Sequence, residues 1–227
     1  MAKTSDSGTT PRTPLSKMRV LRTAMRLADE SGIEELSMRK LAQELDVKAM
    51  SLYNHVANKD DIIDSIVDLV VSEIEVPNLR SDWKTAMRQR ATSAHEVLLR
   101  HAWATLPMVS RINVGPAMLR YVDATIGCLY EAGFSLELAD YAWNAIDSHV
   151  YGFTLQELNF PIETAEYSAK AKEYLPMISA DIYPYMNQLS QRVADGLYDG
   201  LYDFEFGLEI ILEGLDKRRN ISLKGIR

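Results

Sequence analysis

The chain has few of the residues that build metal and disulfide sites. Its 227 residues include one cysteine, Cys128, and four histidines. A single cysteine excludes an intramolecular disulfide framework and a cysteine-based zinc cluster, and it fits a reducing compartment, so we expect a cytoplasmic protein. His95 and His101 are six residues apart, whereas two metal ligands on one helix are three or four residues apart. The sequence therefore predicts neither a metal site nor a cofactor.

Long apolar runs and catalytic motifs are also absent. No segment approaches the roughly 18 consecutive apolar residues that cross a bilayer, and the N-terminal segment lacks the apolar core of a signal peptide. The chain has no glycine-rich phosphate loop, no nucleophile elbow and no pair of residues with metal-ligand spacing. We therefore expect neither a membrane protein nor an enzyme.

What the sequence does contain is an uneven distribution of charge. Its formal net charge is −7, which argues weakly against a nucleic-acid-binding protein. Residues 1–59, however, carry 10 Lys and Arg against 7 Asp and Glu, whereas residues 60–227 carry 15 against 25. A basic head on an acidic body is typical of a DNA-binding regulator, although many neutral domains have a similarly small excess of positive charge.

The pattern of the first quarter of the chain indicates an arm and three short helices. Residues 1–15 are rich in Thr, Ser and Pro without a hydrophobic period, which predicts a disordered arm. Apolar residues then recur at helical spacing over 16–32, 37–46 and 49–56. The connection between the second and third helices is so short that they must cross steeply, as in a helix-turn-helix.

Further helical patterns occupy the rest of the chain. A helix capped by Asn58 is predicted over about 59–75 and links the head to the body. More helices are predicted at about 82–101, 116–132, 135–158, 163–175, 185–198 and 204–219. Because no alternating strand pattern occurs, we predict an all-α fold of nine or ten helices.

Several stretches resemble a known family. Residues 36–45 (LSMRKLAQEL) and 51–59 (SLYNHVANK) resemble the DNA-binding head of the TetR family of regulators. Residues 133–137 (GFSLE) and 206–211 (FGLEII) resemble the body of its tetracycline-repressor subgroup. The resemblance covers nearly the whole chain after residue 15.

This resemblance implies an all-α homodimer. Each subunit would have a helix-turn-helix DNA-binding domain at 16–60 and a ligand-binding and dimerisation domain at 61–227. Two helices of each subunit, about 135–158 and 204–219, would form a four-helix interface. The apolar stripes on these helices suit such a bundle, although a core within one subunit would explain them equally well. The predicted interface residues are Leu138, Ala142, Ala145, Ile146, His149, Phe153, Phe204, Leu208, Ile211 and Leu215.

The DNA contacts are predicted from residue types and from the resemblance. In a helix-turn-helix the second helix enters the major groove, and lysines that flank it can pair with phosphates. The predicted contacts are Arg39, Lys48, Ala49, Met50, Ser51, Tyr53, Asn54, His55 and Lys59. Asp46 occupies a turn position that is commonly glycine in the family, where a left-handed conformation costs Asp about 1 kcal/mol. The helical corner alone is equally compatible with proteins that never bind DNA.

Large apolar side chains with polar groups among them indicate a small-molecule site in the body. The predicted effector-binding residues are Trp103, Met108, Ile112, Met118, Tyr121, Trp143, Asn144, Asp147 and Tyr151, and ordinary core packing is the alternative for each. The tetracycline repressors bind drug through a metal held by a histidine, and residues 105–115 contain none. Glu157, where the subgroup has a carboxylate contact, is expected to lack an imidazole partner, so we predict an effector other than magnesium-tetracycline.

The sequence therefore predicts a ligand-responsive transcriptional regulator. We expect a repressor that binds a palindromic double-stranded DNA operator as a homodimer and is released by a small apolar or aromatic effector. The acidic total charge and the lack of an arginine in the recognition helix leave one alternative, a dimeric helical ligand-binding or interaction protein without DNA affinity.

Overall fold

The computed structural model describes residues 14–78, 80–201 and 203–225, so the predicted arm, residues 1–15, lies almost entirely outside the described residues. In these ranges the chain forms α-helices and short 3-10 helices and no β-strand, which confirms the all-α fold. None of the helices described is long and apolar enough to cross a membrane.

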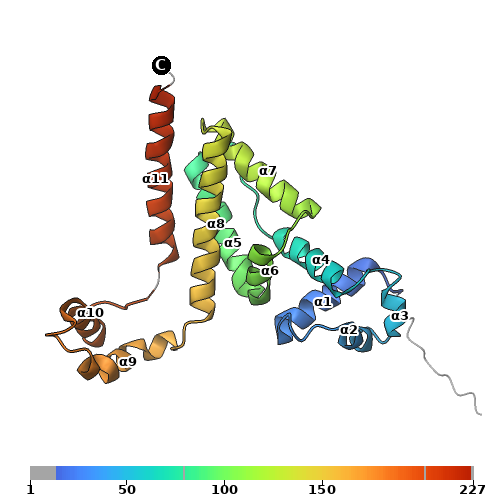
Figure 1. Cartoon of the computed structure of the whole chain (residues 1–227), viewed down its shortest axis with the longest axis horizontal. Coiled ribbons are helices and arrows are strands. Elements are labelled where there is room, and N and C mark those ends of the chain that lie inside the picture. The colour runs from blue at the N-terminus through green and yellow to red at the C-terminus, as the bar shows by residue number, and fades with distance from the viewer. Residues whose placement is uncertain (1–13, 79, 202, 226–227) are drawn as a thin grey trace, which may run out of the picture.

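The N-terminal head is a small helical unit at one end of the molecule (Figure 1). It contains α1 (Lys17–Ser31), α2 (Met38–Glu44) and α3 (Ala49–Leu52), and α4 (Lys59–Val71) packs against α1 and continues towards the body. The apolar faces of these helices join the same buried cluster as the apolar core of the body. The head is therefore packed onto the body rather than tethered to it.

Local signals explain where these helices begin and end. The backbone N–H of Lys40 donates to Ser37 Oγ over 3.2 Å, and that of Asp61 donates to Asn58 Oδ1 over 2.9 Å. Both predicted N-caps are confirmed, since each oxygen satisfies a donor that has no partner within its helix. Gly32 ends α1 with a φ of 83°, a conformation that favours glycine.

The body is built around one long helix and three helices that pack on it. α5 (Trp83–Arg100), α7 (Pro116–Glu131) and α11 (Phe204–Gly225) all contact the 23-residue helix α8 (Leu136–Leu158). Figure 1 shows α8 and α11 running side by side. Short η1 (Ala102–Ala104) follows α5.

The helix α6 (Thr105–Ser110) was not predicted, because Pro107 was interpreted as a break. Pro107 lies in the first turn of α6, where backbone N–H groups have no partner within the helix and a proline is therefore tolerated. The helix contacts both α4 and α8, so it adds a link between head and body.

A lobe formed by α9 (Tyr167–Tyr174) and α10 (Pro184–Ala194) stands apart from the rest of the body (Figure 1). The two helices pack mainly against each other and the adjoining 3-10 helices η2 (Thr164–Glu166) and η3 (Leu175–Met177). The buried residues of α10 are not part of the main hydrophobic cluster. We call this pair the α9–α10 lobe.

Candidate nucleic-acid interface and effector site

The turn between α2 and α3 has a defined geometry. Asp46 has a φ of 52°, so it adopts the left-handed conformation that we expected at this position. The Val47 N–H donates to Ala42 O over 3.0 Å and the Asp46 N–H donates to Gln43 O over 3.1 Å. These two bonds form a Schellman motif, which satisfies carbonyl groups at the end of α2 and reverses the chain.

The recognition helix is shorter than predicted. The α-helical part of the predicted segment 49–56 is only α3, and Tyr53 to His55 form turns. The His55 N–H donates to Leu52 O over 2.8 Å, which tightens the last turn. Leu52 and Val56 are buried and hold this segment against the rest of the head.

Most of the predicted DNA contacts lie on the outer side of this corner. The exposed members of the set are Arg39, Lys48, Ala49, Met50, Tyr53 and Asn54, and the half-buried members are Ser51, His55 and Lys59. Met50 is 75% exposed, which is unusual for a large apolar side chain. Lys59 Nζ donates to Glu34 O over 3.4 Å, so its ammonium group is held next to the end of α1.

A carboxylate on α4 holds the start of α7. Asp68 Oδ1 accepts hydrogen bonds from the backbone N–H groups of Ala117 and Met118, over 3.0 and 2.9 Å. A Cβ atom at Gly115 would overlap the Asp68 carboxylate, so glycine permits this close approach. An anionic side chain at a helix N-terminus is favourable because it satisfies free N–H groups and complements the helix dipole. The sequence analysis missed this link.

Ion pairs and hydrogen bonds add further links between the head and the body. Arg111, after α6, pairs with Asp64 of α4 over 2.7 Å. At the other side of the head, Asp29 of α1 accepts hydrogen bonds from Trp103 Nε1 and from His101 Nδ1, each over 2.7 Å. Trp103 therefore contacts the head through its indole N–H.

Three of the predicted effector residues converge on the buried carboxylate of a fourth, Asp147. Asp147 of α8 accepts hydrogen bonds from Trp143 Nε1 over 2.7 Å, from Tyr151 OH over 3.2 Å and from Tyr121 OH over 3.4 Å. Burial raises the pKa of both tyrosine hydroxyls, so they remain protonated and act as donors.

The other predicted effector residues do not join this cluster. Ile112 is 89% exposed, and Asn144 is exposed and hydrogen-bonded to Asp140 of its own helix, so neither side chain points into the body core. Trp103 faces the head, whereas Met108 and Met118 are buried in the main hydrophobic cluster.

The counter-ion of Asp147 was not predicted from the sequence. Arg90 of α5 is fully buried, and its Nη1 lies 2.7 Å from Asp147 Oδ1 and also donates to Tyr121 OH. The guanidinium group also stacks over the Tyr121 ring at 5.0 Å from its centroid. Arg90, Asp147 and the three aromatic residues around the carboxylate form what we call the Arg90–Asp147 cluster.

The expectation that Glu157 has no imidazole partner is wrong. Glu157 Oε2 lies 3.0 Å from Nε2 of His95, which belongs to α5. The Thr154 hydroxyl donates to Val150 O over 2.7 Å, so its oxygen accepts from His95 Nδ1 over 2.9 Å.

A cleft of about 540 Å³ opens at this pair. Burial lowers the pKa of His95, although the nearby Glu157 acts in the opposite direction. The cleft is lined by His95, Phe153, Glu157, Leu158, Phe160, Ile162, Glu163, Leu201 and Phe204. The His95 ring stacks on Phe204 with their centroids 4.3 Å apart. The cleft therefore combines aromatic walls with one polar pair, His95 and Glu157.

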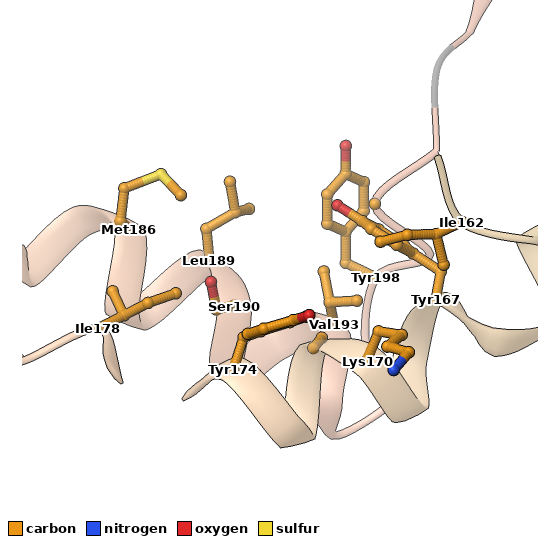
Figure 2. Close-up of a pocket in the computed structure, with 12 residues that line it drawn as sticks. Ile162, Tyr167, Lys170, Tyr174, Ile178, Met186, Leu189, Ser190, Val193 and Tyr198 are labelled. Atoms are coloured by element: carbon orange, nitrogen blue, oxygen red, sulfur yellow. The ribbon is translucent and has the colours of Figure 1, made fainter. Parts of the chain in front are cut away.

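A second, smaller cavity lies within the α9–α10 lobe, and Figure 2 shows it. Its volume is about 230 Å³. Tyr167 and Tyr174 of α9 face Leu189 and Val193 of α10 across it. The sequence analysis did not predict this cavity, because its residues come from two separate helices and the loop beyond them.

Part of the predicted dimer interface is wrong. Ala142, Ile146 and Leu208 are fully buried within one chain, because the stripe chosen from the sequence is the face on which α8 and α11 pack into the subunit core. Phe204 and Leu215 are also buried, whereas Leu138, His149, Phe153 and Ile211 are half-buried and Ala145 is exposed.

A different face of the same two helices is exposed. On α8 the exposed stripe consists of Tyr141, Ala145, Ser148 and Gly152, and on α11 it includes Phe206, Ile210, Gly214 and Ile221. Tyr141 is 70% exposed and Phe206 is 66% exposed. We call these eight residues the outer α8–α11 face.

An exposed recognition segment on a helix-turn-helix head, joined through α4 to an all-α body, defines the class of two-domain DNA-binding regulators. Residues 20–66 match the family described as bacterial regulatory proteins, tetR family. Residues 76–219 match the family described as tetracyclin repressor-like, C-terminal domain. The chain belongs to the TetR family of transcriptional regulators.

Individual relatives agree with this assignment over most of the chain. It is 29% identical over 216 residues to the HTH-type transcriptional repressor DrrR1 of Streptomyces coeruleorubidus, covering 91% of this chain and 79% of the relative. It is 30% identical over 212 residues to the class C tetracycline repressor protein of Escherichia coli, covering 90% and 92%. The Streptomyces coelicolor TetR family protein ActR in complex with actinorhodin has a TM-score of 0.77 and 30% identity, with coverage of 91% and 99%.

Proposed function

We propose that the protein is a ligand-responsive transcriptional repressor that binds a palindromic operator as a homodimer and is released by a small aromatic effector. One observation carries the proposal: the helix that leaves the DNA-binding head, α4, is hydrogen-bonded through Asp68 to the start of α7 in the body. Movement in the body therefore reaches the head through direct contacts. We assign residues 16–60 to DNA binding and residues 61–227 to effector binding and dimerisation.

For DNA recognition, α3 and the turn after it enter the major groove. Ala49 and Met50 can contact thymine methyl groups, and Asn54 can hydrogen-bond to a base edge. Lys48 and Tyr53 can contact phosphates beside the groove. Their exposure on the outer side of the corner supports these roles.

For dimerisation, the outer α8–α11 face packs against the same face of a second copy. Two helices from each subunit then form a four-helix bundle, and an isologous contact of this kind gives a closed dimer. Exposed Tyr141, Phe206 and Ile210 would be buried, which stabilises the pair by removing apolar surface from water. Small residues such as Ala145 and Gly152 allow the helices to approach closely.

The α9–α10 lobe extends the same interface. In one chain it exposes several large apolar side chains, among them Met177 and Tyr185, and it lies on neither α5 nor α7. A two-helix unit with so little core of its own is stabilised by a partner surface. The lobe lies beyond the C-terminal end of α8 and the N-terminal end of α11 (Figure 1), and the second subunit is the partner that we propose for it.

The effector binds in the body near α5 and α8. The cleft at His95 and Glu157 has the volume and the aromatic lining of a small-molecule site, with a few polar groups that orient the ligand. That ActR has been crystallised with actinorhodin supports a small-molecule effector for this chain too.

Release of DNA follows from a change in the orientation of α4. Two recognition helices of a dimer must span half-sites roughly 34–36 Å apart, so a tilt of α4 in each subunit moves them out of register. The ligand acts only through its higher affinity for the tilted state. The body sets the position of the head through the contacts of Asp68, Arg111 and Asp29.

Selection of bound sequences from a random pool of DNA duplexes tests this function. Enrichment of a palindromic duplex that binds one dimer per site supports the proposed function. If no sequence is enriched, the protein is a ligand-binding or interaction protein without DNA affinity, and the exposed surfaces of the body then hold its function.

A further inference from the structure

Arg90 has hydrogen-bond donors that no described residue satisfies. Its side chain is fully buried, and Nη1 contacts Asp147 and Tyr121. Among the described residues, Nε and Nη2 have no hydrogen-bond partner. A buried donor without a partner is costly, and a charged one especially so, so oxygen acceptors supplied by a bound molecule would be favourable at this edge of the guanidinium group.

The carboxylate beside Arg90 cannot satisfy this edge. Asp147 already accepts from Arg90 and Tyr121 through Oδ1, and from Trp143 and Tyr151 through Oδ2. These four donors account for the acceptor capacity of one carboxylate. Both oxygens of Asp147 are therefore fully used as acceptors, whereas Nε and Nη2 of Arg90 remain donors without a partner among the described residues.

The free edge has a specific shape. Nε–H and one N–H of Nη2 are parallel and lie in the guanidinium plane, so they match two adjacent oxygen acceptors. The charge of Arg90 is already neutralised by Asp147, so a neutral pair of acceptors fits without adding a buried net charge. A lysine could not provide this geometry.

The aromatic-lined cleft and the cluster lie along one face of α8. Asp147, Tyr151, Thr154 and Leu158 follow one another at intervals of three or four residues, which places them on the same side of the helix. Leu158 lines the cleft, and Thr154 hydrogen-bonds His95 at its wall. A ligand that reaches from the cleft to Arg90 along this face has to enter between α5 and α8, which pack against each other.

We propose that the Nε–Nη2 edge of Arg90 recognises the effector, and that the effector is an aromatic compound with two adjacent oxygen acceptors, such as a carbonyl next to a ring hydroxyl. The inference rests on the proposed function, since it names the chemistry of the ligand for the same body site. It also assigns to Arg90 a role in specificity that is separate from its ion pair with Asp147.

Three compounds with one skeleton test the proposal in the full-length dimer. The probes are 1-hydroxy-2-acetylnaphthalene, with a neutral acceptor pair, 1-hydroxy-2-naphthoate, with an anionic pair, and 2-ethylnaphthalene, with none. We expect at least one oxygenated probe to bind about tenfold or more tightly than the hydrocarbon by calorimetry, because hydrogen bonds to a charged group are strong. Comparison of the two oxygenated probes shows whether the site prefers a neutral ligand or an anion.

Variants then assign the preference to Arg90. Arg90→Lys should bind the oxygenated probes and the hydrocarbon with about equal affinity. Arg88→Lys, a matched change at a half-exposed position of α5, should keep the wild-type preference for the oxygenated probe. If Arg90→Lys does not fold, the double variant Arg90→Met/Asp147→Leu replaces the buried pair by apolar side chains, a change that proteins often tolerate, and should show the same loss.

Two results would overturn the inference. One is equal binding of all three probes, or no binding of any of them at millimolar concentration. The other is a preference that survives in both Arg90 variants. Operator binding by the wild type and by Arg90→Lys is measured in parallel. If it is intact in both while the probes fail, the assignment of Arg90 is wrong and the DNA-binding function stands.

Discussion

Asp68 Oδ1 accepts a hydrogen bond of 2.9 Å from the backbone N–H of Met118, and through it a helix of the head holds the first turn of a helix of the body. The contact joins residues that are 50 positions apart in sequence. A change in the position of α7 therefore displaces α4, on which the orientation of the recognition segment depends.

Asp68→Ala should expose the N-terminus of α7. Removal of a side chain that caps a helix costs about 1 kcal/mol of stability, and the Ala117 and Met118 amides should exchange with solvent faster. Gly115→Ala should have the same effect on both amides, because its Cβ displaces the Asp68 carboxylate. Hydrogen exchange of the two amides and urea unfolding measure these effects.

The control is Asp123→Ala, which removes an exposed carboxylate from α7 away from its first turn. It should leave the exchange of both amides unchanged. Wild-type protection in Asp68→Ala and Gly115→Ala would show that Asp68 does not hold the start of α7.

Tyr53→Ala and Lys59→Ala should each weaken operator binding without unfolding the dimer. Both side chains lie at the recognition segment. Lys59 supplies one positive charge, so its removal should also reduce the slope of log affinity against log salt concentration by about one. Fluorescence anisotropy on a selected duplex measures both effects.

Leu52→Ala, in contrast, should destabilise the protein by about 2–5 kcal/mol, because Leu52 is fully buried. Wild-type affinity in both surface variants would reject the assignment of the groove segment.

Gly152→Arg should convert the dimer into monomers. Gly152 lies on the outer α8–α11 face, and a Cβ added there would have no neighbouring atom within 4 Å, so the new side chain fits the single subunit but blocks a partner. Gly127→Arg is the matched control, because Gly127 of α7 is equally open and lies outside that face. Sedimentation velocity should show a monomer for the first and a dimer for the second. A dimer in both would place the interface elsewhere.

The stability of the protein should fall as the pH decreases below the ordinary pKa of histidine, about 6.5. Burial lowers the pKa of His95, so the unfolded chain binds a proton that the folded chain binds less readily. Stability is therefore full above that pH and is lost as the pH falls towards the pKa of the folded state, with a slope of at most about 1.4 kcal/mol per pH unit.

Two variants test the cause of this pH dependence. His95→Asn should reduce the slope, since it removes the titrating group. Glu157→Gln should increase the loss of stability at low pH, because Glu157 is the charge that opposes the lowering of the His95 pKa. Urea unfolding between about pH 5 and pH 8 measures the slopes. Equal slopes in all three proteins would exclude His95 as the source.

Features that depend on local sequence were predictable. Ser37 and Asn58 cap helices because a short polar side chain before an apolar period satisfies the first free N–H groups, and this needs no knowledge of the rest of the chain. The left-handed turn at Asp46 followed from the resemblance, because this turn position is commonly glycine in the family. The fold class followed from periodicity in the same way.

Contacts between distant helices were not predictable from periodicity. Arg90 lies on a helix with several charged residues, where a single arginine is normally solvated, and only its position opposite Asp147 of α8 shows that it is buried. Likewise, His95 and Glu157 become partners only when α5 packs on α8. Each residue looked unpaired because its partner is more than 50 positions away.

Part of the interface prediction is wrong for a different reason. The most regular apolar stripe on α8, which includes Ala142 and Ile146, is the one that fills the subunit core. The outer face mixes Tyr141 with small residues such as Gly152, so it has a weak hydrophobic period. A helix with one face in the subunit core and another in the proposed dimer interface shows only the stronger of the two apolar periods in its sequence.

The most direct test of the central claim is the affinity of the dimer for a selected palindromic duplex at 50 and 200 mM salt. Binding to six or more phosphates predicts a loss of about a thousandfold between these concentrations. A steep loss with one dimer per duplex is the result that an operator-binding regulator gives. Affinity that is weak and nearly independent of salt would contradict the account and show that the helix-turn-helix of this chain does not bind DNA.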